Sequence, residues 1–166
     1  MALVKEDGSQ VANSNSYVND ADYVAYAAAR GKTIGTDATA REIELIKAMD
    51  FIESHRRQFK GLKVAFDQYL QWPRFSVFID GFDIGSDVIP DELQNAQMET
   101  GIAYNAFEVL NTGTNQNVQS ESIGELSVSY FNGGSWETPQ LETINVYLEV
   151  LLNTSSIGIS ALVSRA

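Results

Sequence analysis

The sequence predicts a mainly α fold, a small helical bundle with a β-hairpin-like arm and an extended C-terminal tail. Two long amphipathic patterns, one after Thr39 and one after Pro90, provide the central helices. Shorter helical patterns follow Asn19 and Pro139. Between the last two helical patterns, apolar residues change from helical spacing to alternation, which is typical of a strand.

Composition limits the class of protein. The chain has 166 residues and 44% hydrophobic content, enough for one well-buried domain. Its net charge is −11, which opposes adhesion to duplex DNA or to an anionic membrane. The absence of cysteine excludes disulfides and thiol catalysis. No signal peptide or membrane-spanning run is recognisable, so we expect a soluble, intracellular protein with no membrane partner.

The first part of the chain divides at Ser16. Residues 1–16 are polar and small, which predicts an extended lead-in that adds little to the core. Asn19 is a suitable N-cap for a helix over about residues 20–30, and Gly31 a suitable C-cap. Val18 can pack on the entry of this helix as a hydrophobic staple.

The second helix is predicted to begin at a capping box, with Thr39 as the N-cap and Glu42 three residues later. Leu45 and Met49 belong to a broad apolar face, which predicts a mostly buried helix. Basic residues and then Gly61 follow its last turns, as the helix dipole and a left-handed C-cap favour.

Residues 71–90 connect the two long helices and are predicted to clamp them together. Pro73 cannot continue a helix, whereas Pro90 suits the first turn of the next one. We expect Trp72, Pro73, Arg74 and Pro90 to form this clamp. The connector holds more large apolar residues than a solvated linker would, so we expect it to fold back across the helix pair and form part of the core. These apolar residues are Trp72, Phe75, Val77, Phe78, Ile79, Phe82, Ile84, Val88 and Ile89.

After the third helix, a polar stretch over residues 111–119 leads to a segment in which the spacing of the apolar residues changes. Leu126, Val128 and Tyr130 alternate with serines, which predicts a strand over residues 125–131 that Ser122 and Ile123 extend, with a tight turn after it. A fourth helix is predicted from Pro139 to about Leu152. The predicted organisation is a lead-in over 1–16, a helical domain over 17–152 with its arm at 118–138, and a tail over 153–166.

No motif supports catalysis, so we expect a protein that is not an enzyme and has no metal or cofactor. Gly31, Lys32 and Thr33 copy only the end of a phosphate-binding loop and follow a helix instead of a strand. His55 is the sole histidine, and no Gly-x-Ser-x-Gly elbow accompanies it. The aspartates near residues 80–87 lack the spacing of a calcium loop.

One cluster offers an alternative function. Arg56, Arg57 and Lys60, with Lys63 nearby, form a candidate nucleic-acid patch. Phe59, Phe66 and Tyr69 could supply faces on which bases stack. The preferred interpretation is a helix end bearing cations beside core aromatics, because the helix dipole and the apolar pattern already account for these residues.

The order of several short motifs resembles the head–tail connector (adaptor, head-completion) proteins of tailed bacteriophages. The resemblance rests on NSYV ending at Val18, WPR ending at Arg74, IP ending at Pro90, the run from Glu121 to Tyr130, and the helix at Pro139. Members of this group are also often labelled as resembling a primosomal single-stranded-DNA-binding domain.

The resemblance implies a structural adaptor in the virion neck, with the host cytoplasm as the place of assembly. It implies a homo-oligomeric ring, a dodecamer, that sits on the portal protein, extends the DNA channel without binding the genome specifically, and receives the tail or a second connector. Leu126, Val128 and Tyr130 would join subunits. The tail would dock on the portal through Ile157, Ile159, Leu162, Val163 and Arg165. The alternative is a single-stranded-DNA-binding accessory protein that uses Arg56, Arg57 and Lys60.

Overall fold

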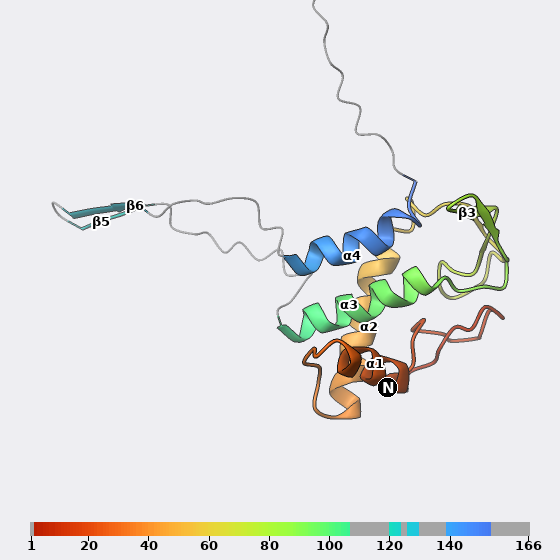
Figure 1. The fold of residues 1–166 in the computed structure, drawn as a ribbon, viewed down its shortest axis with the longest axis horizontal. Coiled ribbons are helices and arrows are strands. Elements are labelled where there is room, and N and C mark those ends of the chain that lie inside the picture. The colour runs from red at the N-terminus through yellow and green to blue at the C-terminus, as the bar shows by residue number, and fades with distance from the viewer. Residues whose placement is uncertain (1, 107–119, 124–125, 130–138, 154–166) are drawn as a thin grey trace, which may run out of the picture.

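The computed structural model describes residues 2–106, 120–123, 126–129 and 139–153, and within these it confirms the mainly α prediction. Four helices, α1 to α4, make the body (Figure 1). The strands among the described residues form three two-stranded antiparallel sheets. Within the described ranges, every helix is too short or too polar to cross a membrane.

Helix α1 (Asp20–Ala29) has the ends that the sequence predicts. The Asn19 side chain accepts a hydrogen bond from the Asp22 N–H at 2.7 Å, and Gly31 takes the left-handed conformation, with φ +61°. Val18 and Tyr23 belong to one buried apolar cluster, so the hydrophobic staple is also confirmed.

Helix α2 (Ala38–Ser54) differs from the prediction at both ends. Its N-cap is Asp37, whose carboxylate accepts the Ala40 N–H at 2.9 Å, so the predicted cap at Thr39 is wrong. Aspartate caps as well as threonine, and the earlier cap lengthens the helix by two residues, about half a turn. The helix stops at Ser54, and Gly61 (φ +66°) serves a later bend instead of the C-cap.

Helices α3 (Asp91–Ala106) and α4 (Pro139–Glu149) complete the body. Helix α3 lies between α2 and α4 (Figure 1) and contacts both. The predicted start beside Pro90 and the buried face of α2 are confirmed. The main core joins apolar side chains of all three helices and the connector, among them Ile52, Trp72, Leu93, Ile144 and Leu148.

The connector forms two small sheets, which the sequence did not reveal. Strand β1 (Leu62–Lys63) pairs with β2 (Arg74–Phe75), and β3 (Val77–Ile79) pairs with β4 (Phe82–Ile84). Val77 and Ile79 are buried, whereas Phe78 is exposed. The expectation that the whole connector is core is therefore wrong for one face of these strands, because successive side chains of a strand point to opposite sides.

The N-terminal segment is also better packed than predicted. Glu6 is fully buried, and its carboxylate accepts the N–H groups of Gly8 and Gln10, both at 2.9 Å. Gly8 has φ +103°, and a Cβ there would lie 1.8 Å from the Asp87 carbonyl oxygen. The segment thus packs closely against the loop before α3. Because it has few apolar residues, it is held by the buried Glu6 carboxylate and its backbone donors instead of by an apolar core.

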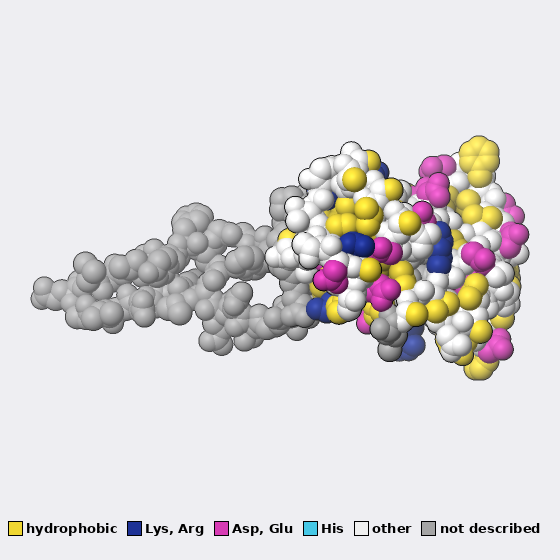
Figure 2. Space-filling model, turned by 90° about the horizontal axis from the view of Figure 1, so that it is seen from below, with side chains coloured by type: hydrophobic (Ala, Val, Ile, Leu, Met, Phe, Trp, Pro, Cys, Tyr) yellow, Lys and Arg dark blue, Asp and Glu magenta, His cyan; other side chains and the backbone are white. Residues whose placement is uncertain are grey.

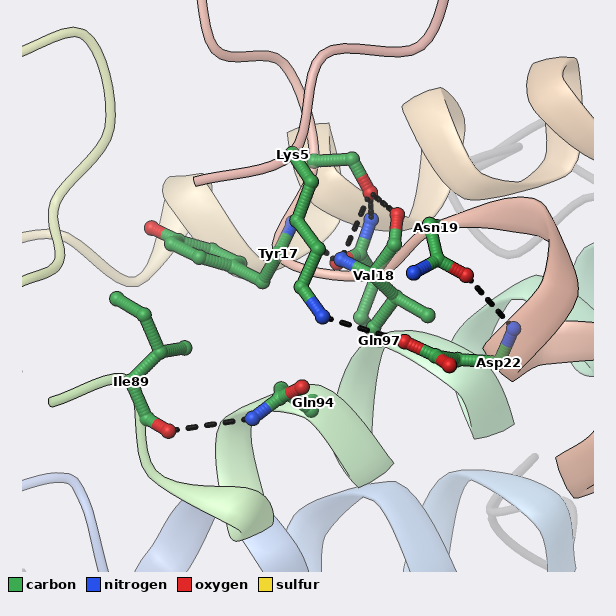
Figure 3. A network of polar contacts seen from close by, with 9 residues as sticks. Lys5, Tyr17, Val18, Asn19, Asp22, Ile89, Gln94 and Gln97 are labelled. Carbon is green, nitrogen blue, oxygen red and sulfur yellow. Dashed lines mark hydrogen bonds and ion pairs between the residues drawn. The ribbon is translucent and has the colours of Figure 1, made fainter. Parts of the chain in front are cut away.

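Gln97 of α3 ties this segment to α2. Its side-chain oxygen accepts the Tyr17 N–H at 2.8 Å, and its amide donates to the Ser16 hydroxyl at 2.8 Å and to the Leu45 carbonyl at 2.9 Å. Figure 3 shows Gln97 beside Tyr17 and Val18. A glutamine in the apolar face of a helix is therefore the residue that positions the chain before α1.

The predicted hairpin-like arm is present with a different layout. Strand β5 (Ser120–Ile123) pairs antiparallel with β6 (Leu126–Ser129), so residues 122–123 belong to a separate strand and do not extend the predicted one. Antiparallel pairing places the reversal between Ile123 and Leu126, earlier than predicted. Tyr130, the predicted turn at 132–134 and the tail over 154–166 lie outside the described residues.

Candidate nucleic-acid interface

Residues 55–75, which we call the basic strip, have a charge opposite to that of the chain. They hold five Lys or Arg side chains and one acid, Asp67, so their net charge is 5 − 1 = +4 against −11 for the whole protein. The five cations are Arg56, Arg57, Lys60, Lys63 and Arg74. Such a local excess can attract phosphate even on an acidic protein, because screening limits each charge to a range of about 10 Å at 0.1 M salt.

Arg74 holds the basic strip together from within. It is buried, and its guanidinium donates to the carbonyls of Lys60 at 2.7 Å and Gly61 at 2.8 Å. It also donates to the Gln71 carbonyl at 3.3 Å. The cost of burying it lowers the pKa of the guanidinium. Arg74 therefore joins β2 to the turn before β1 and is not available to a ligand.

A second anchor links the strip to the end of α2. The Glu53 carboxylate accepts the Tyr17 hydroxyl at 2.6 Å and the Gln71 N–H at 3.1 Å. The Tyr17 oxygen in turn accepts the Trp72 N–H at 3.2 Å. Burial raises the pKa of Glu53 above its ordinary value and, with the Glu53 charge beside it, raises the pKa of Tyr17.

This raised pKa predicts how Glu53 affects stability with pH. A carboxyl group with a higher pKa in the folded protein binds more protons there than in the unfolded chain, so its contribution to stability falls as pH rises from the unfolded pKa through the folded one. We expect the free energy of unfolding of the wild type, minus that of Glu53→Gln, to decrease as pH rises above about 4.3. Urea denaturation of both proteins across pH measures this difference, and a difference that rises with pH would contradict it.

The four exposed or half-exposed cations of the strip differ in their availability. The Lys60 ammonium donates to the Val150 carbonyl at 2.8 Å, and that of Lys63 to the Gln68 carbonyl at 3.0 Å. Arg56 and Arg57 are exposed in the turn after α2, and neither forms an ion pair within the described part of the chain. Of the predicted patch, Arg56 and Arg57 are thus the side chains most free to meet phosphate.

Two of the three predicted stacking residues are exposed. Phe66 is fully exposed and Tyr69 is 57% exposed. The expectation for Phe59 is wrong: it is 3% exposed and packs edge-on against Trp72, with ring centroids 6.1 Å apart. Phe59 itself forms a β-bridge with Leu152 and belongs to the core cluster that includes Ile144 and Leu148 of α4.

Sequence reasoning missed two apolar contributors to this surface. Leu62 and Phe75 are direct cross-strand partners in β1 and β2, and both side chains are exposed. The expectation that Phe75 lies in the core is wrong, because its side chain is 40% exposed. Its neighbour Arg74 is buried, and side chains alternate along a strand, so the exposure of Phe75 follows from the burial of Arg74. The strand has only two residues, which is too short for this alternation to be recognised in the sequence.

The surface therefore combines two features that single-stranded nucleic acid requires. Exposed aromatic rings allow bases to stack, and free guanidinium groups pair with the phosphates between them. Figure 2 shows hydrophobic and acidic side chains over the end of the molecule that carries β3, with basic side chains nearer the middle of the body. Within the described ranges, no group of three or more histidines or acids could hold a metal ion.

Fold and surface together define a small helical protein with exposed aromatic and basic side chains on one short segment. A family model matches residues 1–166, the entire chain, and its description is "Putative DnaT-like ssDNA binding protein". The chain belongs to this family. No curated protein and no solved structure matches it.

The interpretation as a phage head–tail connector is wrong. The family whose model covers the chain from end to end is described by single-stranded DNA binding and not by a place in a virion. Short motifs such as WPR carried the resemblance, and Trp72 and Arg74 of that motif have structural roles that a different function can share. The assigned portal-docking residues, from Ile157 to Arg165, lie outside the described residues. Association of the chain with itself stays a prediction.

Proposed function

We propose that the protein binds single-stranded DNA through the basic strip, as an accessory protein without catalytic activity of its own. The observation that carries the proposal is that Phe66 and Tyr69 are exposed on the same short segment as Arg56 and Arg57, which are exposed and have no ion pair within the described residues. The family description supports the same class of ligand.

The arrangement favours a single strand over a duplex. In a duplex the bases are stacked on one another and their faces are closed to side chains, so Phe66 and Tyr69 contribute little there. The remaining attraction would come from phosphate contacts alone, which the net charge of −11 opposes. A single strand offers base faces that are worth about 1–3 kcal/mol for each aromatic contact.

Fluorescence anisotropy with a labelled oligothymidine strand tests the proposal. We expect saturable binding, and we expect Phe66→Ala with Tyr69→Ala to weaken it by at least about tenfold, since two stacking contacts are removed. Arg56→Gln with Arg57→Gln should weaken binding and make the slope of log K against log salt shallower by about 1.4, because each lost phosphate contact on a single strand changes it by about 0.7.

A matched control uses exposed residues outside the strip. Ile43 lies on α2 and Lys32 follows α1, and both are exposed. Ile43→Ala with Lys32→Gln should bind the strand as the wild type does. Equal affinities for the aromatic variant and this control would overturn the proposed surface, and tighter binding of a duplex of the same length would overturn the proposed preference.

A further inference from the structure

A second charged segment lies directly after the basic strip. Residues 77–92, which we call the acidic hairpin, contain β3, β4 and the loop to α3, and hold five acids and no Lys or Arg. Its acids are Asp80, Asp83, Asp87, Asp91 and Glu92. None of them forms an ion pair within the described part of the chain. Charges of the two signs are therefore separated into neighbouring segments.

The two segments are packed side by side. Only Ser76, with φ +57°, separates β2 from β3. A Cβ on Gly61, beside β1, would lie 2.3 Å from the Phe75 carbonyl oxygen and 2.6 Å from a Val77 methyl group. Figure 1 shows the chain around β3 gathered at one end of the molecule. The basic strip and the acidic hairpin thus share this end.

Exposed apolar side chains lie on both charged segments. Leu62 and Phe75 are exposed on the basic strip, and Phe78 and Phe82 on the acidic hairpin, where Phe82 is 75% exposed. Phe78 pairs across the sheet with Asp83, so the two side chains lie on the same face of the hairpin. Clustered exposed apolar residues bordered by charge are typical of a surface that another molecule covers.

We propose that the molecule covering this end is a second copy of the chain, in a twofold arrangement. A twofold axis along the boundary between the two segments brings the acidic hairpin of one copy onto the basic strip of the other, twice over. Each copy then supplies the charge that the other needs, and Phe75, Phe78 and Phe82 are removed from water. The chain carries both halves of the contact, and single-stranded DNA would compete with the second copy for Arg56 and Arg57.

Salt sets the conditions of the test. Two copies of net charge −11 repel at long range, whereas the facing segments attract at short range. At about 0.1 M salt the Debye length is about 10 Å, which screens the distant charges more than those in contact, and at about 1 M it is about 3 Å. We expect a dimer at the lower concentration that dissociates towards monomer at the higher one.

Two charge-reversal variants identify the contact. Asp83→Lys with Asp87→Lys changes the net charge of the hairpin from −5 to −1, and Arg56→Glu with Arg57→Glu changes that of the strip from +4 to 0. Each variant alone should be monomeric, near 18.3 kDa by light scattering, because both copies of its contact lose most of their attraction. An equimolar mixture should restore a dimer, because one of its two contacts then joins an unchanged hairpin to an unchanged strip and the other joins segments of charge −1 and 0, which do not repel. The assay contains no nucleic acid, since Arg56 and Arg57 are also the groups offered to phosphate.

The mixture separates a broken contact from a damaged fold, because an unfolded variant could not regain a partner. A wild type that stays monomeric at about 0.1 M salt at every protein concentration would overturn the proposal and leave the surface to another ligand. A dimer that persists in either variant alone, or a mixture that stays monomeric while both variants are folded by circular dichroism, would overturn it equally.

Discussion

Trp72→Ala is expected to lower the free energy of unfolding by about 3–5 kcal/mol. Trp72 is completely buried, and it joins the core to which α2, α3 and α4 contribute. The substitution removes the indole that packs against Phe59 and leaves a cavity that the surrounding helices cannot fill. A loss of this size is a large part of the roughly 5–15 kcal/mol that stabilises a typical domain. Urea denaturation measures it.

Two further substitutions make the result specific. Phe66→Ala changes another aromatic residue of the same region but a fully exposed one, so it should alter stability by no more than about 0.5 kcal/mol. Trp72→Phe should cost less than Trp72→Ala, because it keeps a ring and removes an indole N–H that has no hydrogen-bond partner within the described residues. Equal stabilities of wild type and Trp72→Ala would show that the core does not depend on this side chain.

Arg74→Leu is expected to lower the free energy of unfolding by about 3 kcal/mol, since a hydrogen bond to a charged group contributes about 1.5–3 kcal/mol. The guanidinium of Arg74 donates hydrogen bonds to the carbonyls of Lys60, Gly61 and Gln71 at the same time. Leucine fills part of the same space but leaves these acceptors without that donor. The loss should appear as a lower urea midpoint with an unchanged slope.

The control for charge is Arg57→Leu, which removes an exposed guanidinium of the same basic strip. Because Arg57 has no ion pair within the described residues, Arg57→Leu should change the free energy of unfolding by no more than about 0.5 kcal/mol. Arg74→Lys should recover only part of the loss, because an ammonium on a flexible stem cannot meet several carbonyls in the fixed geometry of a guanidinium. A stability of Arg74→Leu equal to that of the control would contradict the structural role.

The family match and the structure together explain why the chain resembles phage head–tail adaptor proteins and why that interpretation fails. The motifs that carried the resemblance contain residues that hold the fold, such as Tyr17, Trp72 and Arg74. Residues of this kind report on architecture, whereas the choice of ligand depends on exposed side chains such as Phe66 and Arg57. The alternative that used the exposed cations is the one that the family supports.

The amino-acid sequence by itself determined the four helices and the starts of α1, α3 and α4. Asn19, Gly31 and Pro90 act through local backbone geometry and hydrogen bonding, so their effects can be read without knowing the fold. The buried face of α2 and the burial of Trp72 followed from apolar spacing in the same way. The cap at Asp37 was missed because Asp37 and Thr39 are both good caps, and local preference does not choose between them.

Only the tertiary structure decided which aromatic residues face water. Phe59 and Phe66 look alike in the sequence, yet Phe59 is buried beneath α4 and Phe66 is exposed. The difference depends on contacts between residues about ninety positions apart, such as Lys60 with Val150. The strands of the connector are too short for a periodic signal, and the buried Glu6 is held by hydrogen bonds instead of apolar contacts. Burial that depends on long-range pairing or on polar satisfaction leaves little trace in local sequence, and this surface depends on both.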